Sequence, residues 1–487
     1  MSQKPQNLLV IMSDEHSIKA LGCYGSDIVQ TPNLDRLAAN GTRFSSAYCS
    51  SPVCIPSRAS FAVGKYIHQV GYWDNADAYD GEVPSWHHHL RERSHDVVSI
   101  GKLHFRKTGE DHGFSEEIVP MHILEGKGDL MGLVRSELPV RKGAYKMAHY
   151  AGPGESTYTM YDRDITARAQ VWLRERALKQ AESDKPWVLF VSLVAPHFPL
   201  TAPPEHYYRY YNQNLPMPKL YGQDERPTHP YLQDYRKSFN YDDYFDRDAV
   251  KRAIAGYYGL CSFLDENVGK ILTSLEEAGL ADSTRIVYTS DHGDNLGTRG
   301  MWGKSTMFEE AAAVPMIIAG DGIPKNKVID TSVSHVDIYP FILDAMGNDE
   351  PQLREGYPGV SLFDVAQDQV PDRNVLVEYH GMGSATGAFM IRNGKYKYVY
   401  YVGYPAQLFD LESDPEELTD LGTNPKYEAV LEECREKLWA ICDPNAVDAR
   451  AKSRQAVLLA ENGGREAVIA RGDLGFTPVP GVAFTLD

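Results

Sequence analysis

Five short apolar runs, each followed at once by polar residues, constrain the fold of this chain more than any other feature. Segments with helical periodicity separate the runs. The runs are NLLVIMSDEH (7–16), DVVSIGKLHF (96–105), PWVLFVSLVAPHFP (186–199), TRIVYTSDHGD (284–294) and VPMIIAG (314–320). Continuous apolar runs are typical of strands buried on both faces. The pattern therefore predicts an α/β fold, with a large mixed, mostly parallel sheet sandwiched by helices.

Two helices between these runs are well marked. Residues 31–41 (TPNLDRLAANG) offer a threonine N-cap, a proline at the first helical position and a glycine after the last turn. From 248 to 278 apolar residues recur every three or four positions, which is typical of a helix with one face on the core. The segments 120–160 and 200–245 lack this periodicity. We expect them to be long loops that build a substrate pocket.

A second, smaller domain is expected because single cores rarely grow beyond about 250–300 residues, and this chain has 487. A change of composition at 365–375 divides a catalytic domain (1–370) from a C-terminal α+β subdomain (371–487). In the latter, AFMIRNGKYKYVYY predicts an antiparallel hairpin that turns at Asn393-Gly394. A helix around 426–441 and an extended tail complete the prediction.

The charge of the chain excludes several classes of partner. With 67 acidic and 49 basic residues the formal net charge is −18, which repels nucleic acid and anionic membrane surfaces. Because no apolar run reaches the roughly 18–20 residues that span a bilayer, and the N-terminus is unlike a secretory signal, we expect a cytoplasmic protein. The six cysteines show neither a CxxC pair nor a metal-ligand spacing.

Two strand ends carry residues that bind metal ions. Asp14 and Glu15 end the first run, and Asp291 and His292 end the fourth. The acidic pair Asp14-Glu15 alone is more often a solvated turn, but together with Asp291 and His292 it offers oxygen and imidazole ligands to calcium, magnesium or manganese. The imidazole favours manganese over calcium.

Cationic residues form a complementary set. Lys102 and His104 have the period-two spacing that places both on one face of a strand. His197 lies between prolines, and Lys304 lies in a loop next to a glycine. Each alone is more often a surface lysine or a hydrogen-bonded histidine. Together they predict a cradle for an anion that also supplies general acids and bases.

The stretch PVCIPSRAS places Cys54 two residues before Pro56. Because Pro56 suits the first position of a helix, Cys54 would lie at the helix N-terminus, where backbone amides favour an anion or a lowered thiol pKa. A thiolate is a poor match, however, for a divalent ion with hard oxygen ligands. The run His87-His88-His89 is interpreted as the polar part of a helix over 85–94, since adjacent residues do not share a face.

Cys54-Ile55-Pro56-Ser57-Arg58 resembles the C-x-P-S-R motif of the sulfatases of the alkaline phosphatase superfamily. The resemblance extends through NLLVIMSDEH, GKLH, APHFP, SDHGDNLG and MWGKSTMFEEAAAVP to the C-terminal IRNGKYKYVYY. Several motifs in the right order are far more specific than any one alone. GYWDNADAYDGEVPSW and VEYHGMG are most similar to the branch of choline-sulfatases, arylsulfatases and phosphonate monoester hydrolases.

The resemblance implies a cofactor and a set of ligands. A separate formylglycine-generating enzyme would oxidise Cys54 to Cα-formylglycine, whose hydrate is an oxygen nucleophile. One divalent ion, Ca²⁺ or Mn²⁺, would be bound by the modified residue 54 with Asp14, Asp291 and His292. Glu15 stands where relatives carry Asp or Gln, and is a further candidate ligand.

The resemblance also implies roles for the basic residues. Arg58 would hold the formylglycine hydrate, and Lys102 and Lys304 would contact the sulfate. His197 with Lys304 would protonate or stabilise the leaving alcohol oxygen. His104 would take the proton that allows sulfate to leave by C–O cleavage. Asn75 would add a hydrogen bond to the sulfate oxygens.

The expected function is therefore hydrolysis of aryl or small alkyl sulfate esters. Trp73, Glu378 and Tyr379 are candidates for a pocket that binds a cationic choline-type group. One alternative is a phosphonate monoester or phosphodiester hydrolase with the same nucleophile, against which Lys102 and His104 match the sulfatase pattern. A second is a silent binding homologue with unmodified Cys54. We also expect a homo-oligomer, a dimer or a tetramer.

Overall fold

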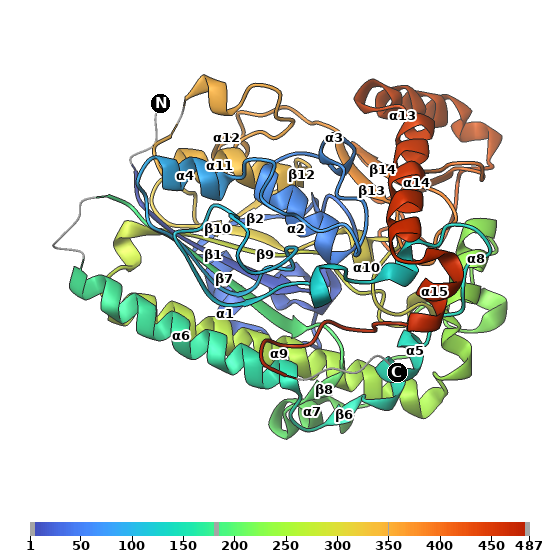
Figure 1. Ribbon diagram of the computed structural model, residues 1–487, viewed down its shortest axis with the longest axis horizontal. Coiled ribbons are helices and arrows are strands. Elements are labelled where there is room, and N and C mark those ends of the chain that lie inside the picture. The colour runs from blue at the N-terminus through green and yellow to red at the C-terminus, as the bar shows by residue number, and fades with distance from the viewer. Residues whose placement is uncertain (1–4, 180–184, 349, 483–487) are drawn as a thin grey trace.

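One eight-stranded sheet lies at the centre of the computed structural model, which describes residues 5–179, 185–348 and 350–482 (Figure 1). The strand order is β11, β2, β10, β9, β1, β7, β4 and β5. In that order the bounds are Lys327–Ile329, Gly41–Phe44, Met316–Ala319, Thr284–Ser290, Asn7–Asp14, Val188–Pro196, Val97–Lys102 and Glu116–Met121. β1, β4, β5, β7 and β9 are parallel, whereas β10 is antiparallel to β9 and β2. The predicted mixed, mostly parallel sheet is confirmed.

Strand β1 shows why the apolar runs have no polar face. Leu8, Val10 and Met12 belong to one hydrophobic core, and Leu9 and Ile11 belong to a second core. All five side chains are fully buried. Because successive side chains of a strand point to opposite faces, an uninterrupted apolar strand needs cover on both faces of the sheet.

Helices provide this cover. Long helices α6 (Thr157–Lys179) and α9 (Arg247–Glu277) run side by side, and α1 (Pro32–Ala39) packs against α9 (Figure 1). The other core is covered by α2 (Cys54–Val63), α4 (Trp86–Glu92) and α11 (Ile338–Ala345), with α12 (Leu362–Ala366) on α11. The helices predicted over 31–41 and 248–278 are confirmed as α1 and α9.

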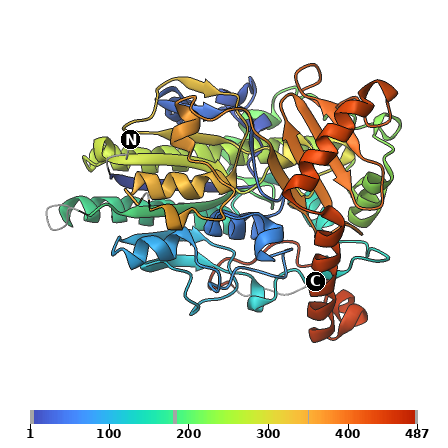
Figure 2. The ribbon, with the colours of Figure 1, turned by 90° about the horizontal axis from the view of Figure 1, so that it is seen from above.

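A four-stranded antiparallel sheet follows in the C-terminal part of the chain. Its strands β13 to β16 are Val375–Tyr379, Ala388–Asn393, Tyr396–Tyr401 and Gln407–Asp410. The predicted hairpin turns at Gly394, where φ is +54°. Helices α13 to α15 are Glu428–Ile441, Pro444–Glu461 and Gly464–Arg471. Figure 2 shows this sheet and its helices beside one end of the large sheet. The domain boundary at 370 stays a prediction.

The two segments expected to be long loops contain helices instead. These are α5 (Gly143–His149), α7 (Pro204–Tyr211) and α8 (Pro230–Phe239). Tyrosines are prominent on the buried faces of α7 and α8; in α7, Tyr207 and Tyr210 pack against α9. Tyrosine-rich helices of eight to ten residues give a weak aliphatic periodicity, and the sequence pattern therefore missed these two. Helix α5 buries Ala144, Lys146, Met147 and Ala148, and seven residues are too short for a clear period.

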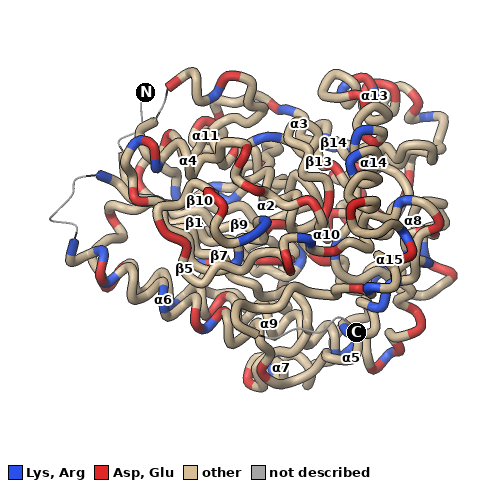
Figure 3. Tube along the Cα trace, viewed as in Figure 1, with Lys and Arg blue, Asp and Glu red and all other residues tan. Residues whose placement is uncertain are grey.

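Short elements complete the described chain. They are the helices α3 (Ile67–Val70) and α10 (Glu309–Ala312) and the two-stranded pairs β3 (Ala47–Tyr48) with β12 (Val333–Ser334) and β6 (Gly152–Pro153) with β8 (Thr201–Ala202). Among the described residues, no helix is long and apolar enough to cross a membrane. Acidic and basic residues are interspersed along the trace in Figure 3.

Helix α6 offers a matched pair of leucines that tests the packing against the sheet. Leu173 is fully buried in the core that α6 and α9 cover, whereas the Leu178 side chain is 82% exposed. We expect Leu173→Ala to lower the free energy of unfolding by about 2–5 kcal/mol. Leu178→Ala should change it by less than about 0.5 kcal/mol. Urea unfolding measures both, and equal losses would contradict this arrangement.

Candidate active site

The polar residues that follow the apolar runs converge at the carboxyl ends of the strands. Asp14 ends β1, Lys102 ends β4, and Asp291 and His292 directly follow β9. Parallel strands end at one edge of a sheet, and for this reason these side chains meet. Cys54 joins them as the first residue of α2, so this helix begins two residues earlier than predicted. Pro56 still lies in the first turn, where a missing N–H leaves no helical bond unmade.

Four buried side chains there could hold a divalent cation. The donor atoms of Asp14, Cys54, Asp291 and His292 all lie within 4.8 Å of one another. Nε2 of His292 lies 3.2 Å from Sγ of Cys54 and 3.6 Å from Oδ1 of each aspartate. Ligands about 2.1–2.6 Å from one ion in octahedral geometry are about 3.0–3.7 Å apart. The group therefore fits a single divalent ion.

Glu15 points to a different part of the site. Its backbone has a φ of +68°, and its Oε2 lies 3.3 Å from Nε2 of His197 and 3.5 Å from Nζ of Lys304. Burial raises the pKa of this carboxyl well above its usual value. Glu15, Asp14 and His197 form a second candidate group that shares Asp14 with the first. The role of Glu15 as a metal ligand stays a prediction.

The thiol of Cys54 is not activated by its place at a helix N-terminus, contrary to expectation. Burial and the nearby carboxylate of Asp14 raise the pKa of Cys54 to about 11. Loss of hydration and a negative neighbour both disfavour the thiolate, and they outweigh the charges of Lys304 and Lys102. The thiol is protonated at neutral pH, and Nζ of Lys304 donates a hydrogen bond to its sulfur at 2.9 Å.

Arg58 connects four elements beneath this site. Its Nε donates to Oδ2 of Asp291 at 2.7 Å, and its Nη1 donates to the backbone oxygen of Lys102 and to Oγ of Ser192. The ammonium of Lys102 pairs with the carboxylate of Asp14. Burial opposes ionisation of Asp14, but Lys102 and the other nearby cations outweigh it and hold the pKa of Asp14 well below its usual value. Asp14 is therefore available as an anionic ligand.

His197 and Lys304 form a donor–acceptor pair at the mouth of the site. Nδ1 of His197 bonds to the backbone oxygen of Phe198 at 2.6 Å, and Nζ of Lys304 lies 2.8 Å from Nε2 of His197. Burial, and next the charge of Lys304, lower the pKa of His197 well below its usual value. In its neutral form the His197 ring donates a hydrogen bond through Nδ1–H and accepts a hydrogen bond from Lys304 at Nε2.

His104 reaches the same site by a route different from the predicted one. Strand β4 ends at Lys102, and His104 follows with a φ of +57°, so the two do not share a strand face. Its Nε2 bonds to Oγ1 of Thr477 at 2.9 Å, in the C-terminal tail. Burial, and next the charge of Lys102, lower the pKa of His104 well below its usual value.

A cavity of about 70 Å³ opens over Cys54, and the tail residues Asp473 to Thr477 form part of its wall. Nη2 of Arg141, also in the wall, donates to Oδ2 of Asp129 at 2.7 Å and to Oδ1 of Asp473 at 2.6 Å. Sequence reasoning did not single out these residues, because their segments carry no catalytic motif. Asp129 and Arg141 do lie in the segment 120–160 that the sequence predicts to build the substrate pocket, whereas the tail is expected only to pack on something.

The other predicted substrate contacts divide into two groups. Asn75 lines the cavity, and its Oδ1 accepts a hydrogen bond from the backbone N–H of Ile55 at 3.2 Å. Trp73, Glu378 and Tyr379 are not among the residues that line it. Glu378 is fully buried, and its Oε1 lies 2.7 Å from Nδ1 of His68.

The surroundings of the run His87-His88-His89 are less polar than predicted. The helix is confirmed as α4, with Ser85 as its N-cap. His87 is fully buried, and its ring stacks on Phe114 with centroids 4.0 Å apart. Burial lowers the pKa of His87 well below its usual value. This histidine is part of the core beside the sheet.

Residues 6–348 match the model of the Sulfatase family, and residues 297–443 match the C-terminal model of N-sulphoglucosamine sulphohydrolase. The chain is 32% identical to a choline-sulfatase of Rhizobium meliloti over 94% of this chain and 90% of that protein. It is 30% identical to arylsulfatase K of Bos taurus over 91% of this chain and 83% of that protein. The chain therefore belongs to the sulfatase family. It is a sulfuric ester hydrolase.

A solved structure shares the fold. The phosphonate monoester hydrolase of Agrobacterium radiobacter superposes with a TM-score of 0.71 and 21% identity over 92% of this chain and 96% of that chain. At this level of identity the likeness concerns the architecture alone. It agrees with the mixed sheet and the C-terminal antiparallel sheet described above.

The hydrogen bond between Thr477 and His104 predicts a role for the tail in positioning a proton-transfer group. Thr477→Val keeps the shape of the side chain and removes its hydroxyl, so we expect kcat for sulfate release to fall about tenfold, a fraction of the usual value of acid–base catalysis. The apparent pKa in the pH profile of kcat should shift as well. Thr477→Ser keeps the hydroxyl and should retain most activity. An unchanged kcat in Thr477→Val would contradict the role.

Proposed function

We propose that this sulfatase hydrolyses aryl or small alkyl sulfate esters with residue 54 as nucleophile, after Cys54 has been converted to formylglycine. The position of Cys54 carries the proposal. Its Sγ lies 3.2 Å from Nε2 of His292, 3.7 Å from Oδ1 of Asp14 and 2.9 Å from Nζ of Lys304. A reacting group there contacts both the candidate metal ligands and a cation able to neutralise a sulfate oxygen. The protonated thiol itself suits neither attack nor metal binding.

One divalent ion, Ca²⁺ or Mn²⁺, would be held by Asp14, Asp291, His292 and residue 54, with Glu15 as a further candidate. Bound there, the ion would supply positive charge that polarises a sulfate oxygen and lowers the pKa of the attacking hydroxyl. The three protein ligands are buried; Lys102 and the other nearby cations keep Asp14 ionised, and Arg58 donates a hydrogen bond to Asp291.

The basic residues divide the remaining tasks by position. Lys102 and Lys304 lie on either side of residue 54 and would stabilise charge on the sulfate oxygens, with Asn75 as a hydrogen-bond donor. His197 with Lys304 would protonate or stabilise the leaving alcohol oxygen; because Nε2 of His197 faces Nζ of Lys304, the proton would come from the lysine. His104, held neutral by burial, would accept the proton that accompanies release of sulfate. Arg58 would orient the nucleophile.

The cavity favours a small substrate. Its volume of about 70 Å³ is far below the roughly 300–1,000 Å³ of pockets for drug-sized ligands. The end near Cys54 is cationic, whereas farther along the wall two carboxylates, Asp129 and Asp473, flank the single guanidinium of Arg141. This distribution suits a sulfate attached to a neutral or cationic organic group. The choline-sulfatase relative agrees with such a substrate.

Phosphonate monoester or phosphodiester hydrolysis is the alternative reaction at the same nucleophile. The structural neighbour of that name supports it only through the shared fold. Sulfate is favoured because Lys102 and His104 match the sulfatase pattern, and both lie at the site: Lys102 pairs with Asp14, and His104 lines the cavity. A silent binding homologue would keep this fold with an unmodified Cys54 thiol.

A maturation partner completes the proposal. Conversion of Cys54 requires a formylglycine-generating enzyme during maturation. A homo-oligomer, a cytoplasmic location and the absence of nucleic-acid or membrane partners stay predictions from the sequence.

Cys54→Ala tests the nucleophile directly. We expect sulfate release from a panel of aryl and alkyl sulfates to fall by a factor on the order of 10⁴ or more, as when a covalent nucleophile is removed. Matched phosphate and phosphonate esters in the same panel measure the alternative reaction. Cys23→Ala is the control. Mass spectrometry of the Cys54 peptide should show formylglycine; an intact thiol throughout, or full activity in Cys54→Ala, would contradict the proposal.

Asp129→Asn tests the charge of the cavity wall. Oδ1 of Asp129 is buried without a hydrogen-bond partner among the described residues. Removing this charge should lower kcat/KM for choline sulfate about tenfold and that for para-nitrophenyl sulfate less than about twofold, since only the former carries a cation. Exposed Asp224→Asn is the control. Equal losses with both substrates would assign Asp129 a structural role only.

A further inference from the structure

We propose that His112, Glu117 and His122 form a second metal site, distinct from the active site, that takes a borderline transition-metal ion such as Zn²⁺. His112 lies in the loop before β5, Glu117 lies in β5, and His122 directly follows β5. One donor atom from each lies within 4.8 Å of the other two. The group shares no residue with the candidate ligands at Cys54, and it lies on the edge strand of the large sheet.

The spacing of the donor atoms suits a small tetrahedral ion. Nδ1 of His112 lies 2.9 Å from Oε1 of Glu117, and Nε2 of His122 lies 3.5 Å from Oε2 of the same carboxylate. With ligands about 2.0–2.2 Å from a tetrahedral zinc ion, neighbouring donor atoms are about 3.3–3.6 Å apart. Small side-chain adjustments therefore bring all three donors to one ion.

The hydrogen bonding of the two rings also points to a ligand. The His122 side chain is only 7% exposed, and neither of its ring nitrogens has a hydrogen-bond partner among the described residues. Nε2 of His112, a fully buried side chain, has none either. Buried polar atoms without partners are uncommon, and each costs free energy. An ion bound by one nitrogen of each ring would give a partner to a buried nitrogen of His122 that otherwise has none.

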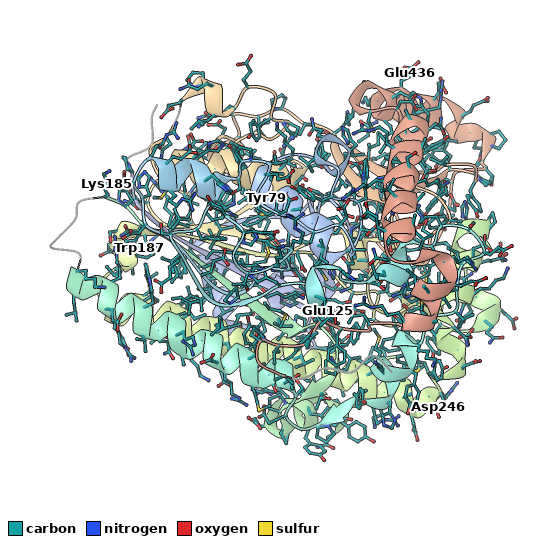
Figure 4. The ribbon with its side chains drawn as sticks, viewed as in Figure 1. Tyr79, Glu125, Lys185, Trp187, Asp246 and Glu436 are labelled. Atoms are coloured by element: carbon teal, nitrogen blue, oxygen red, sulfur yellow. The ribbon has the colours of Figure 1, made fainter. Side chains whose placement is uncertain are left out.

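The surroundings supply the outer shell that metal-binding histidines require. Oε2 of Glu110 lies 3.8 Å from Nε2 of His112, beside the ring nitrogen that faces away from Glu117. A carboxylate in this place orients the ring and raises its basicity. Phe105 and Tyr79, the latter labelled in Figure 4, lie near the His112 ring, with centroid distances of 5.1 and 6.1 Å. They limit access of water on that side.

The donor set distinguishes this site from the active site. Two imidazoles and one carboxylate favour Zn²⁺, Co²⁺ or Ni²⁺, whereas Ca²⁺ and Mg²⁺ prefer oxygen ligands throughout. The side chain of Glu117 is 19% exposed, which provides a path for the ion. The backbone N–H groups of Leu103 and His104 bond to the oxygen of Met121, next to His122. An ion here would therefore fix the end of β5 behind His104.

Zinc binding to the full chain tests the site in a background without the active-site metal. Asp291→Asn removes a candidate ligand at Cys54 and leaves the second group intact. After metal removal, calorimetric titration of this variant with zinc chloride should give about one equivalent per chain. Adding His122→Gln or Glu117→Gln should abolish that equivalent. Adding Glu110→Gln should weaken binding about 10–100-fold. Exposed His149→Gln is the matched control and should change nothing.

The outcomes separate this site from the active site. If Asp291→Asn does not fold, the same titration in the wild type should give about two equivalents, reduced to about one by His122→Gln. Far-UV circular dichroism establishes that each variant is folded. Absence of zinc binding in folded Asp291→Asn, or binding that His122→Gln and Glu117→Gln leave unchanged, would overturn the proposal. If the proposed sulfatase activity at residue 54 is not found, the result of the zinc titration still stands.

Discussion

The buried pair of Arg58 and Asp291 is the interaction on which the rest of the site depends. Both side chains are almost completely inaccessible, and two buried charges stabilise a fold only when further hydrogen bonds compensate for their lost hydration. Here the guanidinium also binds the backbone oxygen of Lys102 and Oγ of Ser192. One residue of α2 thereby holds the ends of β4, β7 and β9 together. The position of Cys54, one turn earlier in α2, follows from this anchor.

Burial then sets the protonation of the groups around Cys54. It raises the pKa values of the Cys54 thiol and the Glu15 carboxyl, and it lowers those of His104 and His197. Each of these groups is thus driven toward its neutral form. Asp14 and Lys304 are exceptions, because Lys102 and the neighbouring cations outweigh burial at Asp14, and the neighbouring Cys54, Glu15 and Asp14 outweigh it at Lys304 and raise the pKa of Lys304 well above its usual value. The site therefore combines an ionised aspartate and a charged lysine with neutral histidines, which suits the proposed hydrolysis of a sulfate ester.

The C-terminal tail contacts residues from distant parts of the sequence at the cavity. Asp473 pairs with Arg141, and Thr477 binds His104 through its hydroxyl and Tyr158 through its backbone oxygen. The cavity wall and the hydrogen bonding of His104 thus depend on a segment more than 370 positions from His104 in sequence. The antiparallel sheet and its helices lead the chain back to this position, and they thereby help to build the active site as well as to cover the end of the large sheet.

The sequence by itself determined the central strands and the residues at their carboxyl ends, because doubly buried strands must be continuously apolar and parallel strands end at one edge. Asp14, Lys102, Asp291 and His292 could be predicted for that reason, and Cys54 through its motif. Only the tertiary structure decided the raised thiol pKa, the separate place of Glu15, and the contributions of Arg141, Asp473 and Thr477. These depend on burial and on contacts between distant segments, and such contacts leave no periodic or local pattern in the chain.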